Sequence, residues 1–90
     1  MEMMTLKLHG RDADGVERYR SYYLVADGGC MAGRGRASVI PMSIGAPMPE
    51  SDHVEVDRGG KEHALMKLVN TLLALPGNEG LSAELNDRPT

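Results

Sequence analysis

The residues that could bind a phosphate group lie in a glycine-rich stretch in the first half of the chain. Gly28 and Gly33 have the spacing of P-loop glycines, but Arg34 occupies the position where that motif requires Lys. The P-loop and the dinucleotide-binding fingerprint also require a helix to follow the glycines. Residues 37–44 instead predict a strand, so we interpret the stretch as a connection between strands and expect no cofactor.

The candidate metal ligands and nucleophiles are His9, His53, His63 and Cys30. They lie far apart in the sequence and lack the paired spacing of a zinc site, so no metal site is predicted. Cys30 would need a nearby base and a lowered pKa, which a glycine-rich loop does not supply. Glu55 and Asp57 lie two apart on one strand face, an arrangement typical of a solvated surface. We assign no catalytic residue.

The most specific functional pattern is an alternation of arginine and tyrosine in residues 16–26. Period-two alternation divides such a strand between two faces. The face with Tyr23 and Val25 is apolar enough to be buried, which leaves the other face for water or a partner. We therefore predict a partner-binding set that consists of Arg18, Arg20, Tyr22, Arg34 and Arg36.

Arg34 and Arg36 belong to this set because they begin the next strand and would join the others if the two strands pair. Guanidinium groups bind phosphates or carboxylates, and an exposed tyrosine offers a stacking platform or an interface anchor. The same arginines could also pair with neighbouring acidic residues as an ordinary soluble surface. The set fits either a protein partner or a nucleic acid.

Alternation and composition predict the elements that must position these residues. Strands are predicted over residues 4–9, 16–26, 36–44 and 53–57. Pro41 lacks an amide donor, which places the third of these strands at an edge or at a bulge. Apolar residues at three-and-four spacing predict a helix over residues 61–75, with one further helical turn within residues 78–85. The order of elements predicts an α+β fold: an antiparallel sheet of three to four strands, then one main C-terminal helix packed on one face.

Length and charge narrow the function classes. Ninety residues with 18 Leu, Ile and Val and no Phe or Trp predict a single small domain over residues 1–90, with residues 85–90 frayed. A net charge of -3 argues against general nucleic-acid binding. A single cysteine, no apolar export segment and no long apolar run predict a cytoplasmic protein without a membrane partner.

In size and in the order of its elements, the chain resembles some small phage-encoded inhibitors, including anti-CRISPR proteins. The resemblance covers architecture and no motif, and it implies a regulatory partner. We expect a non-catalytic interaction or regulatory module, of inhibitor or adaptor type, that binds another protein or a nucleoprotein complex. The alternative is a sheet-based nucleic-acid binder that uses the arginine and tyrosine set, and a small oligomeric enzyme ranks third. Numerous methionines and an edge strand also favour a homodimer.

Overall fold

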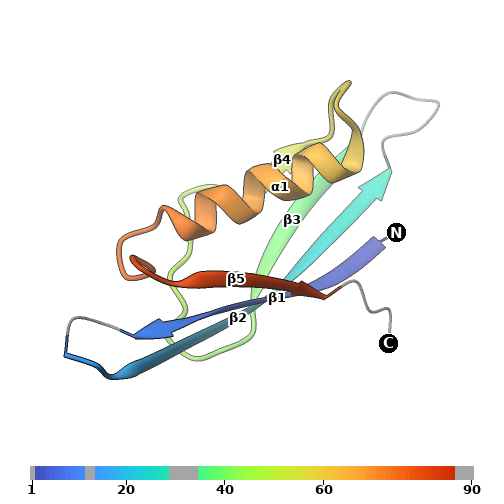
Figure 1. Ribbon diagram of the computed structural model, residues 1–90. Helices are drawn as coiled ribbons and strands as arrows, with labels where there is room; N and C mark the ends of the chain where they lie inside the picture. Colours follow the sequence, from blue (N-terminus) through green and yellow to red (C-terminus); the bar gives the residue numbers. More distant parts are fainter. Residues whose placement is uncertain (1, 12–13, 29–34, 87–90) are drawn as a thin grey trace.

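The backbone forms one antiparallel sheet of five strands with a single helix across one of its faces (Figure 1). This computed structural model describes residues 2–11, 14–28 and 35–86. The elements are β1 (Glu2–Arg11), β2 (Glu17–Gly28), β3 (Gly35–Pro41), β4 (His53–Glu55), α1 (Gly60–Leu73) and β5 (Ser82–Asn86). The strands lie in the order β4-β3-β2-β1-β5. The predicted α+β class, with the helix after the first four strands, is confirmed.

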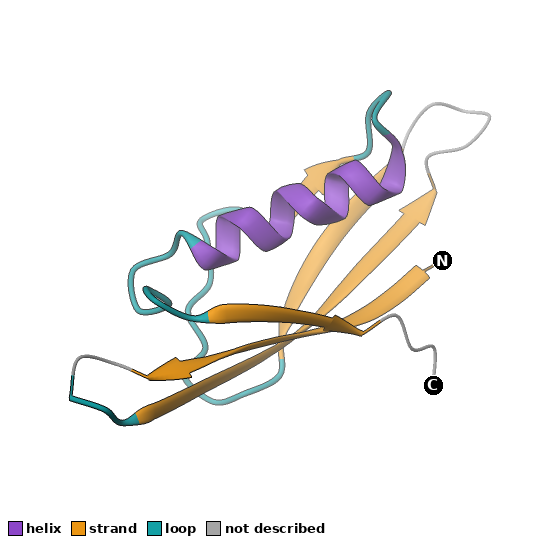
Figure 2. Ribbon diagram, viewed as in Figure 1, coloured by secondary structure: helices purple, strands orange, loops and turns teal. Residues whose placement is uncertain are grey.

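β1 and β2 form the long central hairpin of the sheet. All of β1 pairs with residues 17–26 of β2, with Leu6 opposite Tyr22. Gly15 in the connection has a φ of +80°, which glycine adopts without a steric penalty. The turn end of this hairpin extends beyond α1 (Figure 2), so the helix does not cover the sheet there.

β3 is an inner strand of the sheet, between β4 and β2, so the prediction that Pro41 places it at an edge is wrong for the strand as a whole. The amide of Val39 donates to the Asp52 carbonyl at 2.8 Å, on the β4 side of the strand. Amides alternate in direction along a strand, so the Pro41 nitrogen faces the same side. β4 pairs only with residues 36–38, and Pro41 therefore lies where no ladder hydrogen bond is lost.

α1 begins and ends within two residues of the predicted bounds. Gly60 has a φ of +83°, which lets the chain turn into the helix. Asp57 holds this entry in place, because its Oδ1 accepts the Gly59 amide at 2.9 Å and its Oδ2 accepts the Lys67 ammonium at 3.2 Å. The described residues contain no helix that is long and apolar enough to cross a membrane, and α1 has only 14 residues.

The hydrophobic core lies between α1 and the face of the sheet that the helix covers. Tyr22 is fully buried and is the largest of the side chains with almost no exposed surface, so it fills volume in a chain without Phe or Trp. Its main companions are the leucines of β1, β2 and α1. The buried apolar residues are Leu6, Leu8, Tyr22, Leu24, Ala26, Ala37, Val39, Val56, Ala64, Leu65, Leu68, Val69, Leu72 and Leu81.

β5 corrects two predictions made for the end of the chain. Residues 78–85 were expected to contain a helical turn and residues 85–90 to fray, but Ser82–Asn86 is a strand that pairs antiparallel with residues 5–9 of β1. The free edge of β1 supplies partners that outweigh the weak strand propensity of a Ser-Ala-Glu-Leu sequence. The sheet therefore has one strand more than the largest predicted number. Residues 87–90 lie outside the described residues.

Candidate protein-binding face

The structure reverses the two faces of β2, so the predicted exposure of Tyr22 is wrong. Tyr22, Leu24 and Ala26 have no exposed surface and face α1. Tyr23 and Val25, which the sequence pattern assigned to the core, lie on the face that no helix covers. Both faces of β2 carry apolar residues. The side of the sheet on which α1 packs determines which of the two faces is buried.

A hydrogen-bond network explains why a tyrosine can occupy the core. The Tyr22 hydroxyl donates to the Pro47 carbonyl at 2.7 Å and accepts from Asn78 Nδ2 at 3.2 Å. Asn78 is itself fully buried, and its Nδ2 also donates to the Leu72 carbonyl near the end of α1 at 2.9 Å. The polar tip of Tyr22 is thus satisfied without contact with water. Tyr22 cannot touch a partner directly.

The predicted arginines do not form one set. Arg18 and Arg20 lie on the helix-facing side of β2, beyond the point where β3 ends opposite Tyr22. Arg20 is half-buried, and its Nη1 donates to the Tyr19 carbonyl at 3.2 Å. Arg36 lies at the other end of the sheet, on the opposite face. Arg34, like Cys30, lies outside the described residues, so its predicted role stays a prediction.

Arg36 is surrounded by acidic neighbours. Its cross-strand partners are Asp27 on β2 and Glu55 on β4, so one row of the sheet reads acidic, basic, acidic. The positive charge of Arg36 also contributes to lowering the pKa of Asp52, after a larger effect from the hydrogen bond with His53. Arg36 fits the expected soluble surface better than it fits a free phosphate-binding group.

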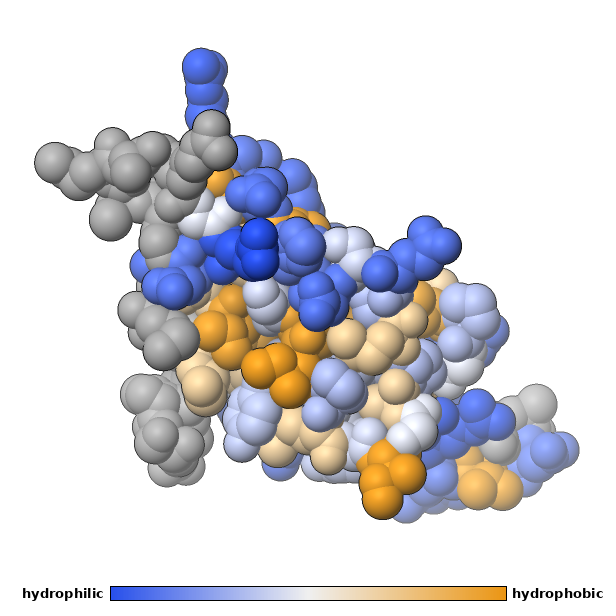
Figure 3. Space-filling view, turned by 180° about the vertical axis from the view of Figure 1, so that it is seen from behind, coloured by the Kyte–Doolittle hydropathy of each residue, from blue (hydrophilic) through white to orange (hydrophobic). Residues whose placement is uncertain are grey.

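The face of the sheet away from α1 carries a group of apolar and aromatic side chains. Cross-strand register places Met3 beside Val25 and Tyr23 beside Ile40. Tyr19 is 52% exposed, Ile40 49% and Met3 37%, while Tyr23 and Val25 are half-buried. Seen from behind, orange and pale-orange hydrophobic residues occupy the middle of the view, with hydrophilic residues above them (Figure 3). We call the five apolar and aromatic residues named above the open-face patch: Met3, Tyr19, Tyr23, Val25 and Ile40.

The charges around the open-face patch nearly cancel. Its described basic residues are Lys7, Arg11 and Arg36, and its described acidic residues are Glu17, Asp27, Glu55 and Glu84. With neutral histidines, three positive and four negative charges give this face a net charge of -1. An apolar centre with a balanced charged rim is the usual layout of a protein-binding surface.

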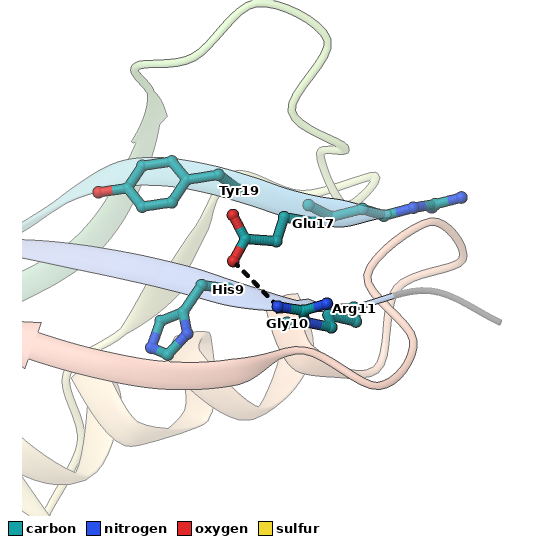
Figure 4. Close-up of a pocket in the computed structure, with 6 residues that line it drawn as sticks. His9, Gly10, Arg11, Glu17 and Tyr19 are labelled. Carbon is teal, nitrogen blue, oxygen red and sulfur yellow. Dashed lines mark ion pairs between the residues drawn. The ribbon is translucent and has the colours of Figure 1, made fainter. Parts of the chain in front are cut away.

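A shallow depression of about 400 Å³ lies at the hairpin end of this face. Figure 4 shows Glu17 and Arg11 directed toward each other from neighbouring strands, at 3.8 Å. His9 and Tyr19 lie opposite each other two register positions further along. The remaining lining residues are Gly10 and Arg18. The Glu17 carboxylate and the Arg11 guanidinium partly neutralise each other at the surface, and Arg18 is the third charged residue of the lining.

The described residues contain no group of three or more His, Cys, Asp or Glu side chains that could hold a metal ion. His53 donates from Nδ1 to Asp52 Oδ1 at 3.1 Å, and this hydrogen bond is the largest cause of the lowered Asp52 pKa. Both side chains are at least partly exposed, and Glu55 lies two residues from His53 on β4. This pair provides neither a buried base nor a nucleophile.

Tyr19 and Tyr23 are the surface residues that sequence reasoning missed as a binding site. The signal was present, because the alternation of residues 16–26 put these two tyrosines on one face. What the sequence lacked was the position of the helix.

Comparison with protein-family models, with curated proteins and with solved structures finds no match for this chain.

Proposed function

We propose that this chain is a non-catalytic interaction module, of inhibitor or adaptor type, that binds another protein through the open-face patch. The observation that carries the proposal is an uncovered sheet face whose exposed and half-buried side chains include two tyrosines, an isoleucine and a methionine. Tyrosine and methionine are enriched at protein interfaces, and a half-exposed isoleucine gains by burial against a partner. The chain has one cysteine and therefore no intramolecular disulfide, and the setting we infer is the cytoplasm.

A nucleic-acid partner is the second candidate, since Tyr19 and Tyr23 could stack on bases. Its electrostatic support is weak, because the same face has a net charge of -1 and the whole chain -3. Phosphate binding requires an excess of Lys and Arg at the contact surface. The favoured partner is therefore a protein surface.

Site-specific photocrosslinking tests this proposal. A photoreactive benzoylphenylalanine replaces Tyr19 on the open face or, as a matched control, Asn70 on the outer side of α1; both positions are exposed. In an extract of cells that produce the protein, we expect a discrete adduct from position 19 and none from position 70. Nuclease treatment identifies the class of the partner, because an adduct with a nucleic acid loses its added mass and an adduct with a protein keeps it.

Competition with unlabelled protein makes the result specific to the face. Unmodified chain should suppress the adduct, whereas the Ile40→Glu variant should not, because a carboxylate in the open-face patch opposes burial. An adduct of equal strength from both positions would remove the proposal. So would an adduct whose added mass is removed by nuclease.

A further inference from the structure

The outer edge of β5 carries backbone groups that no strand of the described sheet uses. The Met42 amide donates to the Ser21 carbonyl, and the Ser21 amide donates to Ser43 Oγ, so Ser21 directs its backbone groups toward β3. Because these directions alternate along antiparallel strands, Thr5, Lys7 and His9 of β1 bond to β5. Their partners on β5 are Ser82, Glu84 and Asn86.

Ala83 and Leu85 therefore direct their amides and carbonyls away from the sheet. A sheet edge of this kind is a template for another strand. Natural edges are often protected by proline, lysine, a bulge or a very short strand. β5 has five residues and none of the first two protections, whereas the opposite edge, β4, has only three residues.

An apolar groove of about 220 Å³ lies beside this edge, between α1 and the ends of β1 and β5. Its lining residues are Met4, Glu62, Leu65, Met66 and Leu85. Met66 is 48% exposed and Leu85 40% exposed, although both belong to regular elements that face the core. A strand added to β5 would place alternate side chains in this groove and would cover both residues.

We propose that the β5 edge and this groove bind an extended segment of a partner protein, with apolar residues at alternate positions and lysine or arginine between them. The segment adds a sixth strand to the sheet: its backbone pairs with Ala83 and Leu85, and an apolar side chain enters the groove beside Met66. The site lies on the edge and the helix side of the sheet. It is thus distinct from the open-face patch, and either site could exist without the other.

The charges around the edge select a basic segment. Glu62 is the charged residue of the groove, and Glu84 lies at the middle of β5 on the open side. Glu84 already has Lys7 opposite it on β1, so a lysine on the added strand would continue the alternation of charge across three strands. Opposite charges at cross-strand positions stabilise pairing, and like charges oppose it.

The same charges argue against a second copy of this chain as the occupant. In the register that pairs all five residues of β5 with those of another β5, the two Glu84 side chains lie directly opposite each other. Like charges in that position destabilise the pair. The peptide that serves as a probe is therefore a basic, alternating one.

The experiment uses the full ¹⁵N-labelled chain and the acetylated, amidated peptide Lys-Val-Lys-Leu-Lys-Val. We expect saturable shifts of the amide signals of residues 82–86 and of Met66, and no shift at Tyr23 or Ile40. A peptide in which alternate amides are N-methylated should not bind, because it lacks the donors for strand pairing. A peptide with Glu in place of each Lys should not bind either.

Variants of the chain separate the charge from the groove. We expect Glu62→Lys combined with Glu84→Lys to weaken peptide binding by at least about fivefold, with Glu50→Lys in an exposed loop as the control. Met66→Ser should weaken binding, whereas Asn70→Ser on the outer side of α1 should not. None of these positions is buried, so folding is preserved and the signals stay comparable.

Three results would overturn the proposal. Shifts centred on Tyr23 and Ile40 would place the peptide on the open face, and equal binding of the N-methylated peptide would exclude strand addition. Shifts of residues 82–86 that depend on protein concentration, without peptide, would make a second copy the occupant. Failure of the photocrosslinking from position 19 has no bearing on these signals, so the two proposals fail separately.

Discussion

Tyr22 and Asn78 show how two polar side chains determine the interior of this small molecule. Tyr22 supplies core volume that Phe or Trp would supply in other chains, and its hydroxyl needs partners once it is buried. Asn78 supplies one of them and also holds the Leu72 carbonyl of α1. No local sequence pattern reveals this role, because Tyr22 lies 56 residues before Asn78 and Leu72 lies 6 residues before it.

Replacement of Asn78 by Ala should destabilise the fold by about 1–3 kcal/mol. The variant removes the Asn78 donor from the Leu72 carbonyl, which keeps only the longer hydrogen bond from the Leu75 amide at 3.3 Å, and it opens a small cavity. Urea denaturation followed by circular dichroism measures the change in free energy of unfolding. The control is Asn70→Ala on the exposed side of α1, for which we expect a change within about 0.5 kcal/mol.

Tyr22→Phe completes a double-mutant cycle with Asn78→Ala. Because the two side chains share a hydrogen bond, their separate costs should not add, with an interaction energy of about 0.5–3 kcal/mol. Strictly additive costs would show that the Tyr22–Asn78 hydrogen bond contributes nothing to stability.

Asp57 links stability to pH at the start of α1. The Gly59 amide, followed by the Lys67 ammonium, holds the pKa of this carboxyl below its ordinary value. A folded-state pKa below the unfolded one means that the contribution to stability is present above about pH 4 and is lost as pH falls through the folded pKa. Denaturation midpoints from pH 7 to pH 2 should therefore fall less steeply for Asp57→Asn than for the original chain. Equal acid sensitivity of the two chains would contradict this role.

At the scale of elements, the sequence predicted the positions of four strands and the helix but not the face of β2 that is buried. Alternation divides residues 16–26 into two sets with certainty, yet each set contains tyrosine and aliphatic residues. The choice depends on where α1 lies, which is a long-range property. A wrong choice of the buried face assigns every residue of the strand to the wrong side of the sheet. This is why Tyr22, predicted to bind a partner, is in fact buried.

β3 offers a direct test of the face assignment with two neighbouring residues. Val39 is 2% exposed and faces α1, whereas Ile40 is 49% exposed and faces away. We expect Val39→Glu to unfold the chain, since an unpaired buried carboxylate costs several kcal/mol against a total stability on the order of 4–13 kcal/mol. Ile40→Glu should cost about 1 kcal/mol or less. Thermal melts of the two variants measure the difference, and the opposite order would restore the face predicted from sequence.

β5 was missed for a different physical reason. Helix and strand preferences of Ser-Ala-Glu-Leu are close, so local sequence does not decide between them. The decision comes from β1, which pairs with β2 on one side and leaves residues 5–9 open on the other. The proposed peptide site follows from this pairing, and no local pattern in residues 82–86 predicts it.

At the scale of the whole molecule, the described residues distribute their charge so that the open face is not basic. The chain has a net charge of -3, and the open face contributes -1 of it among the described residues. Arg36 lies between Asp27 and Glu55, and Arg11 pairs with Glu17. Each of these guanidinium groups thus already has acidic neighbours, which a phosphate would have to displace.

This distribution predicts weak or no binding of nucleic acid despite the two exposed tyrosines. Affinity that depends on phosphate contacts falls by orders of magnitude between low and physiological salt, and a face without excess positive charge gains little from counterion release. Fluorescence anisotropy of labelled single-stranded and duplex oligonucleotides, across a salt series, measures this. We expect no saturable binding at about 150 mM salt. Binding with a steep salt dependence, lost in Tyr19→Ala and Lys7→Ala but not in Lys67→Ala on the helix, would instead make the open face a nucleic-acid platform, because stacking and phosphate contacts would then outweigh its negative rim.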